Sequence, residues 1–404
     1  MASLTRQARL IQTRILIISD THGMQFSSEA KPREHADVVI HCGDLTEHSK
    51  LEEFRQAIQL LDEINAPIKL VIAGNHDFTL DIPKFKDKIS EANRRYKRNP
   101  GDDLVKRDFG HYGEAMKLLE RAKDKGIIFL NEGSHTIPLQ NGAILNVYAS
   151  PYTPSNSGGW GFQYFGCHDF NILDGTDMVI THGPPHGILD RTGSNSRIGC
   201  PQLFTAVAEA RPRIHCFGHV HDGWGAKLVT WRPTIPDVPT HFNAIDNGAS
   251  TLIADLWRLK QQESELFGGV EKEEKTEIGT LKRQSCYRTS HCKYDKHPLT
   301  PEQTLFINAA TMGCEGLTQK PWLVTIELPQ NPEANGVADV DEEACVMPAT
   351  RVLGESKREA TANVVGNLQP SDMMPRPEWK PALTKKVADQ EKRGKKRKLN
   401  EREP

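Results

Sequence analysis

Five short stretches of the sequence place an acidic, amide or imidazole side chain directly after a run of apolar residues. Each run is short, rich in β-branched residues and bounded by Gly, Asp or Pro, which is typical of a buried strand. Burying such polar groups is costly unless a partner compensates them. The stretches are ISDTHG (18–23), GDLTE (43–47), GNHD (74–77), THGPP (181–185) and GHVH (218–221).

These stretches supply a set of candidate metal ligands: Asp20, His22, Asp44, Asn75, His182, His219 and His221. Functional groups of open α/β sheets gather at the carboxyl ends of the strands, so we expect these side chains to meet. A mixed shell of carboxylate, amide and imidazole groups suits Mn, Fe or Zn better than Ca. Two such ions, about 3.5–4 Å apart and bridged by a carboxylate, can hold a phosphate and activate water. Asp44 stands in the middle of the series and suits the bridge, although the sequence alone leaves that assignment open.

Each of these residues also has a simpler interpretation. A lone histidine at a strand end is more often a hydrogen-bonded surface residue, but an ordered series favours a shared site. Asp77 either orients His76 or hydrogen-bonds its own loop. Trp160 either stacks on a base or packs under a Gly-rich loop, and His186 either lines the substrate cleft or is simply exposed. The spacing of Cys286, His291, Cys292 and His297 does not fit a zinc site, and we interpret them as loop residues.

The elements that must hold the candidate ligands alternate between strands and helices, which predicts an α/β layered fold. The helical pattern of apolar residues predicts helices over 52–64, 114–126 and 203–210. We predict strands over 14–19, 37–41, 68–74, 126–131, 143–150, 177–183, 213–219 and 304–310.

The composition changes along the chain and predicts its organisation. We assign residues 1–330 to one domain, in which the Pro-rich and charged residues 231–303 form a loop insertion. Residues 331–404 read as a disordered polar tail. A basic cluster at 385–398 is either a nuclear-import signal or a solvated charge run.

Composition also limits the setting in which the chain works. Its 404 residues carry a net charge of −2, so nucleic acid would be bound only through the basic tail. Eight scattered cysteines indicate reduced thiols in an intracellular compartment, nuclear or cytoplasmic. No apolar run approaches about 18 residues, so we expect no membrane span. The oligomeric state is not indicated.

The ordered motifs resemble the calcineurin-like metallophosphoesterase superfamily, in its metallophosphoesterase domain-containing branch. The resemblance covers roughly residues 14–230 and 304–328 and includes SGGWGF (157–162) and HCFGHVHDGWG (215–225). It implies a four-layer α-β-β-α sandwich with mixed sheets. GDLTE departs from the usual second motif, because it supplies Glu47 in a looser register.

The resemblance also implies a binuclear centre, with manganese expected and Fe, Zn or Mg as alternatives. One ion would be held by Asp20, His22, Asp44 and His221. The other would be held by Asp44, Asn75, His182 and His219. His76 would protonate the leaving alkoxide.

We therefore expect a phosphodiesterase that hydrolyses a small, cyclic nucleotide-like phosphodiester by attack of a metal-bound hydroxide. Asp44 and His76 would be catalytic, and Asn75, His76, Trp160 and His186 would face the substrate. Three alternatives stay open: a serine/threonine phosphoprotein phosphatase, a nuclease, and a scaffold that binds metal or nucleotide without turnover. A monoester dianion usually needs an additional arginine, and no motif of this sequence supplies one.

Overall fold

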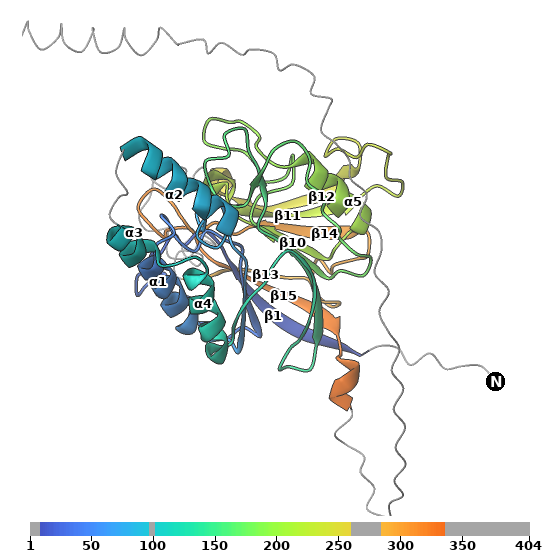
Figure 1. Ribbon diagram of the computed structural model, residues 1–404. Coiled ribbons are helices and arrows are strands. Elements are labelled where there is room, and N and C mark those ends of the chain that lie inside the picture. The colour runs from blue at the N-terminus through green and yellow to red at the C-terminus, as the bar shows by residue number, and fades with distance from the viewer. Residues whose placement is uncertain (1–8, 97–101, 260–283, 336–404) are drawn as a thin grey trace, which may run out of the picture. The chain divides into compact units, whose positions relative to one another are not determined.

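The computed structural model describes residues 9–96, 102–259 and 284–335, which form two large β-sheets with helices outside them, and one small two-stranded sheet (Figure 1). The helices are α1 (Leu51–Asp62), α2 (Ile82–Tyr96), α3 (Asp102–Phe109), α4 (Glu114–Arg121) and α5 (Pro201–Ala210), with short 3-10 helices η1 (Ala122–Lys125), η2 (His221–Gly223) and η4 (Pro332–Asn335). The strands are β1 (Leu10–Ile18), β2 (Val38–His41), β3 (Ile68–Val71), β4 (Ile127–Phe129), β5 (Gly133–Pro138), β6 (Ile144–Ser150), β7 (Thr153–Pro154), β8 (Gln163–Tyr164), β9 (Met178–Thr181), β10 (Ile214–Phe217), β11 (Gly225–Trp231), β12 (Ile245–Asp255), β13 (Tyr287–Ser290), β14 (Gln303–Asn308) and β15 (Trp322–Pro329).

Both large sheets mix parallel and antiparallel pairing. The first has the strand order β13-β15-β1-β2-β3-β4, and the second has the order β12-β11-β14-β10-β9-β6-β5. β1 is parallel to β2 but antiparallel to β15, and β14 is parallel to β10 but antiparallel to β11. The strands that carry the candidate ligands, β1 to β3 and β9 to β10, are parallel to their ligand-bearing neighbours within each sheet.

The alternation of side chains along β1 shows how the layers form. Successive side chains of a strand point to opposite faces. Ile15 and Ile17 enter the core that both sheets share, whereas Leu16 and Ile18 enter a second core beneath α1 and α4. α5 packs on the outer face of the other sheet, over a third core. The predicted four-layer α-β-β-α sandwich with mixed sheets is therefore confirmed.

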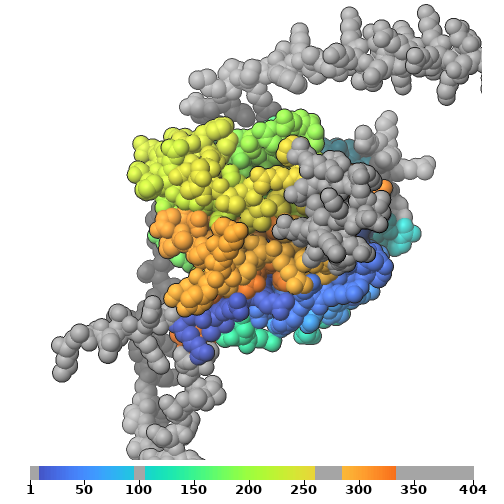
Figure 2. Space-filling model, turned by 180° about the vertical axis from the view of Figure 1, so that it is seen from behind, coloured from blue at the N-terminus to red at the C-terminus, as the bar shows by residue number. Residues whose placement is uncertain are grey.

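The last strands of the chain tie the two sheets together. β15 pairs with β1 in the first sheet, and β14 pairs with β11 in the second. Figure 2 shows this from behind, where the orange C-terminal strands lie between the blue N-terminal region and the yellow β12 region. Strands that lie far apart in the sequence are thus paired in both sheets.

The predicted strands and helices are confirmed, but the predicted loop insertion at 231–303 is wrong for two segments. β12 extends the second sheet beside β11, and β13 extends the first sheet beside β15. Both are edge strands with many exposed residues, so they lack the continuous apolar run that predicts a buried strand. Residues 260–283 of that range lie outside the described residues.

The predicted tail at 331–404 is described only through residue 335, where η4 follows β15. The remainder, including the basic cluster at 385–398, lies outside the described residues. Among the helices of the described part, none is long and apolar enough to cross a membrane.

A buried histidine in β10 makes the stability of the fold depend on pH. The Nε2 atom of His215 lies 2.9 Å from the hydroxyl of Thr181, while its buried Nδ1 atom has no partner among the described residues. Burial lowers the pKa of His215 from 6.5 to about 3. As the pH falls, His215 is therefore protonated in the unfolded chain before it is protonated in the folded chain. Its contribution to the free energy of unfolding is complete above pH 6.5 and is lost as the pH falls toward 3.

The variant His215→Gln should flatten this dependence. The stability difference between wild type and variant should change by about 1.4 kcal/mol for each pH unit between 6.5 and 3, because glutamine has no proton to bind. Urea unfolding of both proteins with a chelator present, at several pH values from 7 to 4, measures this difference. Parallel curves for the two proteins would show that the neutral histidine does not govern acid stability.

Candidate metal centre

The seven candidate ligands come together at the carboxyl ends of five strands. Asp20 and His22 follow β1, Asp44 follows β2, and Asn75 follows β3, all in the first sheet. The remaining three follow β9 and β10 of the second sheet: His182, His219 and His221. The site therefore joins the ends of two sheets, which the sequence alone did not indicate.

One cluster contains Asp20, His22 and His221, whose potential ligand atoms all lie within 4.8 Å of one another. The Nε2 atoms of the two histidines are 3.4 Å apart, and Nε2 of His221 is 3.3 Å from Oδ1 of Asp20. Burial alone would raise the pKa of Asp20, but its hydrogen bond to His221 lowers that pKa to about 2. The cluster therefore presents an ionised carboxylate and two converging imidazoles.

The second cluster contains Asp44, His182 and His219, with ligand atoms again within 4.8 Å of one another. Nε2 of His182 lies 3.3 Å from Oδ2 of Asp44 and 3.0 Å from Oδ1 of Asn75. Burial opposes both charges, yet the pair holds the pKa of Asp44 far below its usual range and raises the pKa of His182 to about 9. A cation in this position would replace the proton that His182 carries.

Asp44 connects the two clusters. Its Oδ2 atom lies 3.3 Å from Nε2 of His182 and 3.8 Å from Nε2 of His22, one histidine from each cluster. Its Oδ1 atom accepts a hydrogen bond of 2.8 Å from the backbone N–H of His76. One carboxylate oxygen therefore faces both groups of ligands, a position from which Asp44 could serve as a shared ligand.

Hydrogen bonds behind the ligands orient them for a cation. Nδ1 of His182 lies 2.9 Å from the carbonyl oxygen of Cys42, so Nδ1 donates, and Nε2 is the nitrogen that faces the cluster and could bind a cation in place of its proton. The carboxylate of Asp20 accepts from the backbone N–H of His219 at 3.0 and 3.1 Å. Together with the converging oxygen and nitrogen atoms, this arrangement fits a divalent cation in each cluster.

Several of the ligands have a backbone conformation that residues other than glycine rarely adopt. Left-handed φ angles occur at four of the seven ligands: Asp20 (55°), His22 (47°), Asp44 (53°) and His219 (66°). Each such residue costs about 1–3 kcal/mol and persists only where its surroundings enforce it, typically at functional sites. Gly74 allows the loops to approach, because a Cβ atom there would lie 2.2 Å from Oδ1 of Asp44.

Asp77 joins the loops after β2 and β3. Its buried carboxylate accepts from the backbone N–H groups of Leu45, Thr46 and Gly74 at 3.1, 3.0 and 2.8 Å, and from the Thr46 hydroxyl at 2.7 Å. Burial and the charge of Asp44 raise the pKa of Asp77 to about 7. Of the two roles considered for Asp77, hydrogen bonding of the loops is the one that these contacts show.

His76 lies beside the clusters. Its Nδ1 atom is 2.7 Å from the carbonyl oxygen of Glu47, and its ring stacks on Trp160 with centroids 4.2 Å apart. Sequence reasoning gave Glu47 no role, yet its carboxylate oxygen Oε2 is 2.8 Å from Nδ1 of His22. The position of Glu47 at the end of GDLTE was the only indication of this contact.

His186 makes its contacts in a different group of residues. Its Nδ1 atom lies 3.3 Å from the carbonyl oxygen of Gly199 and 3.7 Å from Oδ2 of Asp190, and its ring is 5.5 Å from that of His241. In the cysteine and histidine segment, His291 bonds through one ring nitrogen to the carbonyl of His297 and through the other to the hydroxyl of Thr289.

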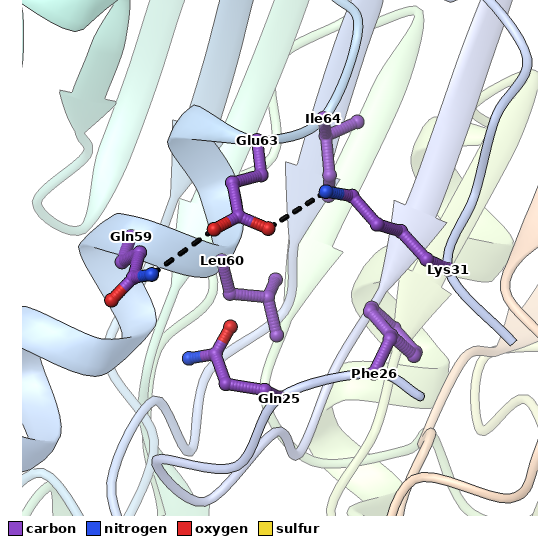
Figure 3. A pocket seen from close by; sticks show the side chains of 7 residues that line it. All are labelled: Gln25, Phe26, Lys31, Gln59, Leu60, Glu63 and Ile64. Atoms are coloured by element: carbon purple, nitrogen blue, oxygen red, sulfur yellow. Dashed lines mark hydrogen bonds and ion pairs between the residues drawn. The ribbon is translucent and has the colours of Figure 1, made fainter. Parts of the chain in front are cut away.

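A pocket beside α1 contains none of the candidate ligands (Figure 3). Glu63 points into it and pairs with Lys31 at 2.7 Å and with Gln59 at 3.1 Å. Its walls are one ion pair, two amides and aliphatic or aromatic carbon, and neither histidine nor aspartate lines it.

Comparisons with known proteins identify the family of the chain. The model of the family described as calcineurin-like phosphoesterase matches residues 13–223. The chain is 31% identical over 224 residues to the human protein named metallophosphoesterase domain-containing protein 1, a match that covers 53% of the chain and 62% of that protein. It is 34% identical over 224 residues to a protein of Emericella nidulans named probable rhamnogalacturonate lyase C, covering 54% of the chain and 18% of that protein.

The matched segment therefore spans less than two thirds of the length of either relative. Among solved structures, the protein TT1561 of Thermus thermophilus aligns with 10% identity and a TM-score of 0.30, over 52% of the chain and 82% of that protein.

Proposed function

The chain belongs to the calcineurin-like phosphoesterase family, and from this we propose that it hydrolyses a small, cyclic nucleotide-like phosphodiester with two divalent cations. The observation that carries the proposal is the position of Asp44, whose Oδ2 atom faces one histidine from each ligand cluster. A site with two adjoining cation positions and a shared carboxylate is suited to clamping a phosphate.

The chain offers a separate ligand set for each cation. Asp20, His22 and His221 would hold the first cation, and Asn75, His182 and His219 the second, with Asp44 common to both. We propose Mn²⁺, with Fe, Zn or Mg as alternatives, because the donors mix oxygen with imidazole nitrogen. When bound, such cations supply positive charge to a phosphoryl oxygen and lower the pKa of a water molecule.

His76 would supply a proton to the leaving group. Its Nδ1 atom is committed to the carbonyl oxygen of Glu47, so the opposite nitrogen, Nε2, is the one that can face a substrate. A correctly placed general acid typically contributes about 10²–10⁴-fold to the rate. The low exposure of Asp20, Asp44 and His182, between 0% and 2%, strengthens every charge interaction around the reacting phosphate.

The arginines of the loop after β9 are already paired with other side chains, which favours a diester over a monoester. A phosphodiester carries one negative charge, whereas a monoester dianion carries two and profits from a free guanidinium group. In the loop after β9, Arg197 forms an ion pair with the buried Asp190, and Arg191 bonds to Asn195. Neither of these two guanidinium groups is left without a partner.

A substrate panel tests this function. We expect the manganese-loaded protein to hydrolyse bis-p-nitrophenyl phosphate and a 2′,3′- or 3′,5′-cyclic nucleotide at least about tenfold faster than p-nitrophenyl phosphate or a phosphoserine peptide, a difference of about 1.4 kcal/mol. The same panel in buffer with a chelator provides the control. A preference for the phosphopeptide would indicate a phosphoprotein phosphatase instead, and one for an oligonucleotide would indicate a nuclease. Absence of turnover on every ester would leave only the scaffold.

A further inference from the structure

We propose that Trp160 is a positioning residue, which fixes the plane of the His76 imidazole for proton transfer. This inference rests on the proposed role of His76 as general acid. The two rings are stacked, with centroids 4.2 Å apart and an angle of 26° between their planes. The indole face in contact with His76 is not available to a substrate base, so this role differs from the substrate contact expected from the sequence.

Two kinds of contact are needed to hold an imidazole in one orientation. The hydrogen bond from Nδ1 to the carbonyl oxygen of Glu47 fixes the direction of one ring atom but lets the ring tilt about that bond. The stacked indole opposes this tilt across the face of the ring. The edge of His22 adds a third contact, with centroids 4.8 Å apart and planes at 87°. Together these contacts determine where Nε2 of His76 points.

The segment that carries Trp160 is hydrogen-bonded to the loop that carries His76. Trp160 lies in the connection between β7 and β8, and the backbone N–H of the next residue, Gly161, donates to the carbonyl oxygen of Asn75 at 3.0 Å. The backbone N–H of Trp160 donates to Oε1 of Gln163 at 3.0 Å, and that of Phe162 donates to Oδ2 of Asp81 at 2.8 Å. The indole therefore moves with the loop that bears His76.

α2 holds the same segment from outside. Lys84 hydrogen-bonds the carbonyl oxygen of Gly158, and the ammonium group of Lys88, one helical turn later, lies 4.8 Å from the centroid of the Trp160 ring. A cation within about 6 Å of an indole centroid is attracted by the ring. A helix that sequence reasoning did not predict thus helps to keep the indole against His76.

Loss of the Trp160 indole should impair proton transfer and not metal binding. The hydrogen bonds described above for the candidate ligands do not involve Trp160, so its truncation should leave cation binding intact. A small displacement of a catalytic group can cost about 10²-fold in rate. The loss should therefore appear only where the leaving group needs a proton, as an alkoxide does and a nitrophenolate does not.

The test compares two diesters in variants of the full chain with manganese. For Trp160→Ala we expect kcat to fall about 10- to 100-fold on a 2′,3′-cyclic nucleotide, which releases an alkoxide. On bis-p-nitrophenyl phosphate kcat should change by less than about threefold, and manganese per chain should not change. Trp160→Phe should recover most of the loss, because phenylalanine retains a stacking face. Trp257→Ala, which removes an indole that is 65% exposed, serves as the matched control.

His76→Ala is measured beside these variants to separate the two claims. If His76→Ala shows the selective loss and Trp160→Ala does not, the positioning role is refuted while the function of His76 stands. An equal loss on both diesters in Trp160→Ala also refutes the positioning role, because it indicates a general structural effect. If His76→Ala itself lacks the selective loss, the proposed general acid is refuted and the role of Trp160 falls with it.

Discussion

Replacing Asp44 with asparagine should reduce kcat/KM for phosphodiester hydrolysis by at least about a thousandfold, which corresponds to about 4 kcal/mol. The reason lies in the position of Oδ2, which is 3.3 Å from Nε2 of His182 and 3.8 Å from Nε2 of His22. An asparagine keeps the size of the side chain but removes the negative charge that compensates two cations. Both ligand clusters should therefore lose affinity at once.

Kinetics with manganese and the manganese content after dialysis measure this effect. The matched control is Asp62→Asn, which removes a carboxylate from an exposed ion pair with Lys125 and should alter stability by no more than about 1 kcal/mol. Urea unfolding of Asp44→Asn establishes that the fold persists. Full activity of this variant would mean that Asp44 is not part of the catalytic site.

Truncation of His182 to alanine is expected to empty one cation position and leave the other. Its Nε2 atom lies between Asp44 and Asn75, and its Nδ1 atom is anchored on the carbonyl oxygen of Cys42. Alanine removes a ligand that belongs to only one cluster. The manganese content should fall from two ions per chain to about one, with turnover reduced by at least about a hundredfold because one half of the phosphate clamp is gone.

The comparison protein is His135→Ala. His135 lies on β5, outside both ligand clusters, and its Nε2 atom is 2.9 Å from the carbonyl oxygen of Asn131, so both ions and full activity should remain. Metal analysis by mass spectrometry and steady-state kinetics on the same preparations provide the two readouts. Retention of two ions in His182→Ala would contradict the assignment of this histidine as a ligand.

The sequence predicts the ligand-bearing strands because each is buried and therefore apolar. Ile15 and Leu16 show the limit of that information, since their types are alike but they face different cores. The sequence does not predict β12, because an edge strand needs no apolar run. It does not predict α2, because most residues of that segment are charged or polar. In α2, Phe85 is the apolar residue that the described part shows as buried.

For the site, residue types and order were sufficient to select the ligands but not to arrange them. No pattern in the amino-acid sequence shows that His182 and His219 follow strands of a different sheet than Asp44 does. Left-handed backbone at Asp20 and His22 depends on the packed loops around them and has no local sequence cause. The contact between Trp160 and His76 likewise joins two segments that only the fold brings together.

We propose that two divalent cations bind where the ends of the two sheets meet and that they share Asp44. Anomalous X-ray diffraction at the manganese edge, from crystals grown with Mn²⁺, would locate these cations. We expect two anomalous peaks about 3.5–4 Å apart, one beside Asp20, His22 and His221 and the other beside Asn75, His182 and His219, with Asp44 between them. A single peak, or peaks away from these side chains, would refute the binuclear site.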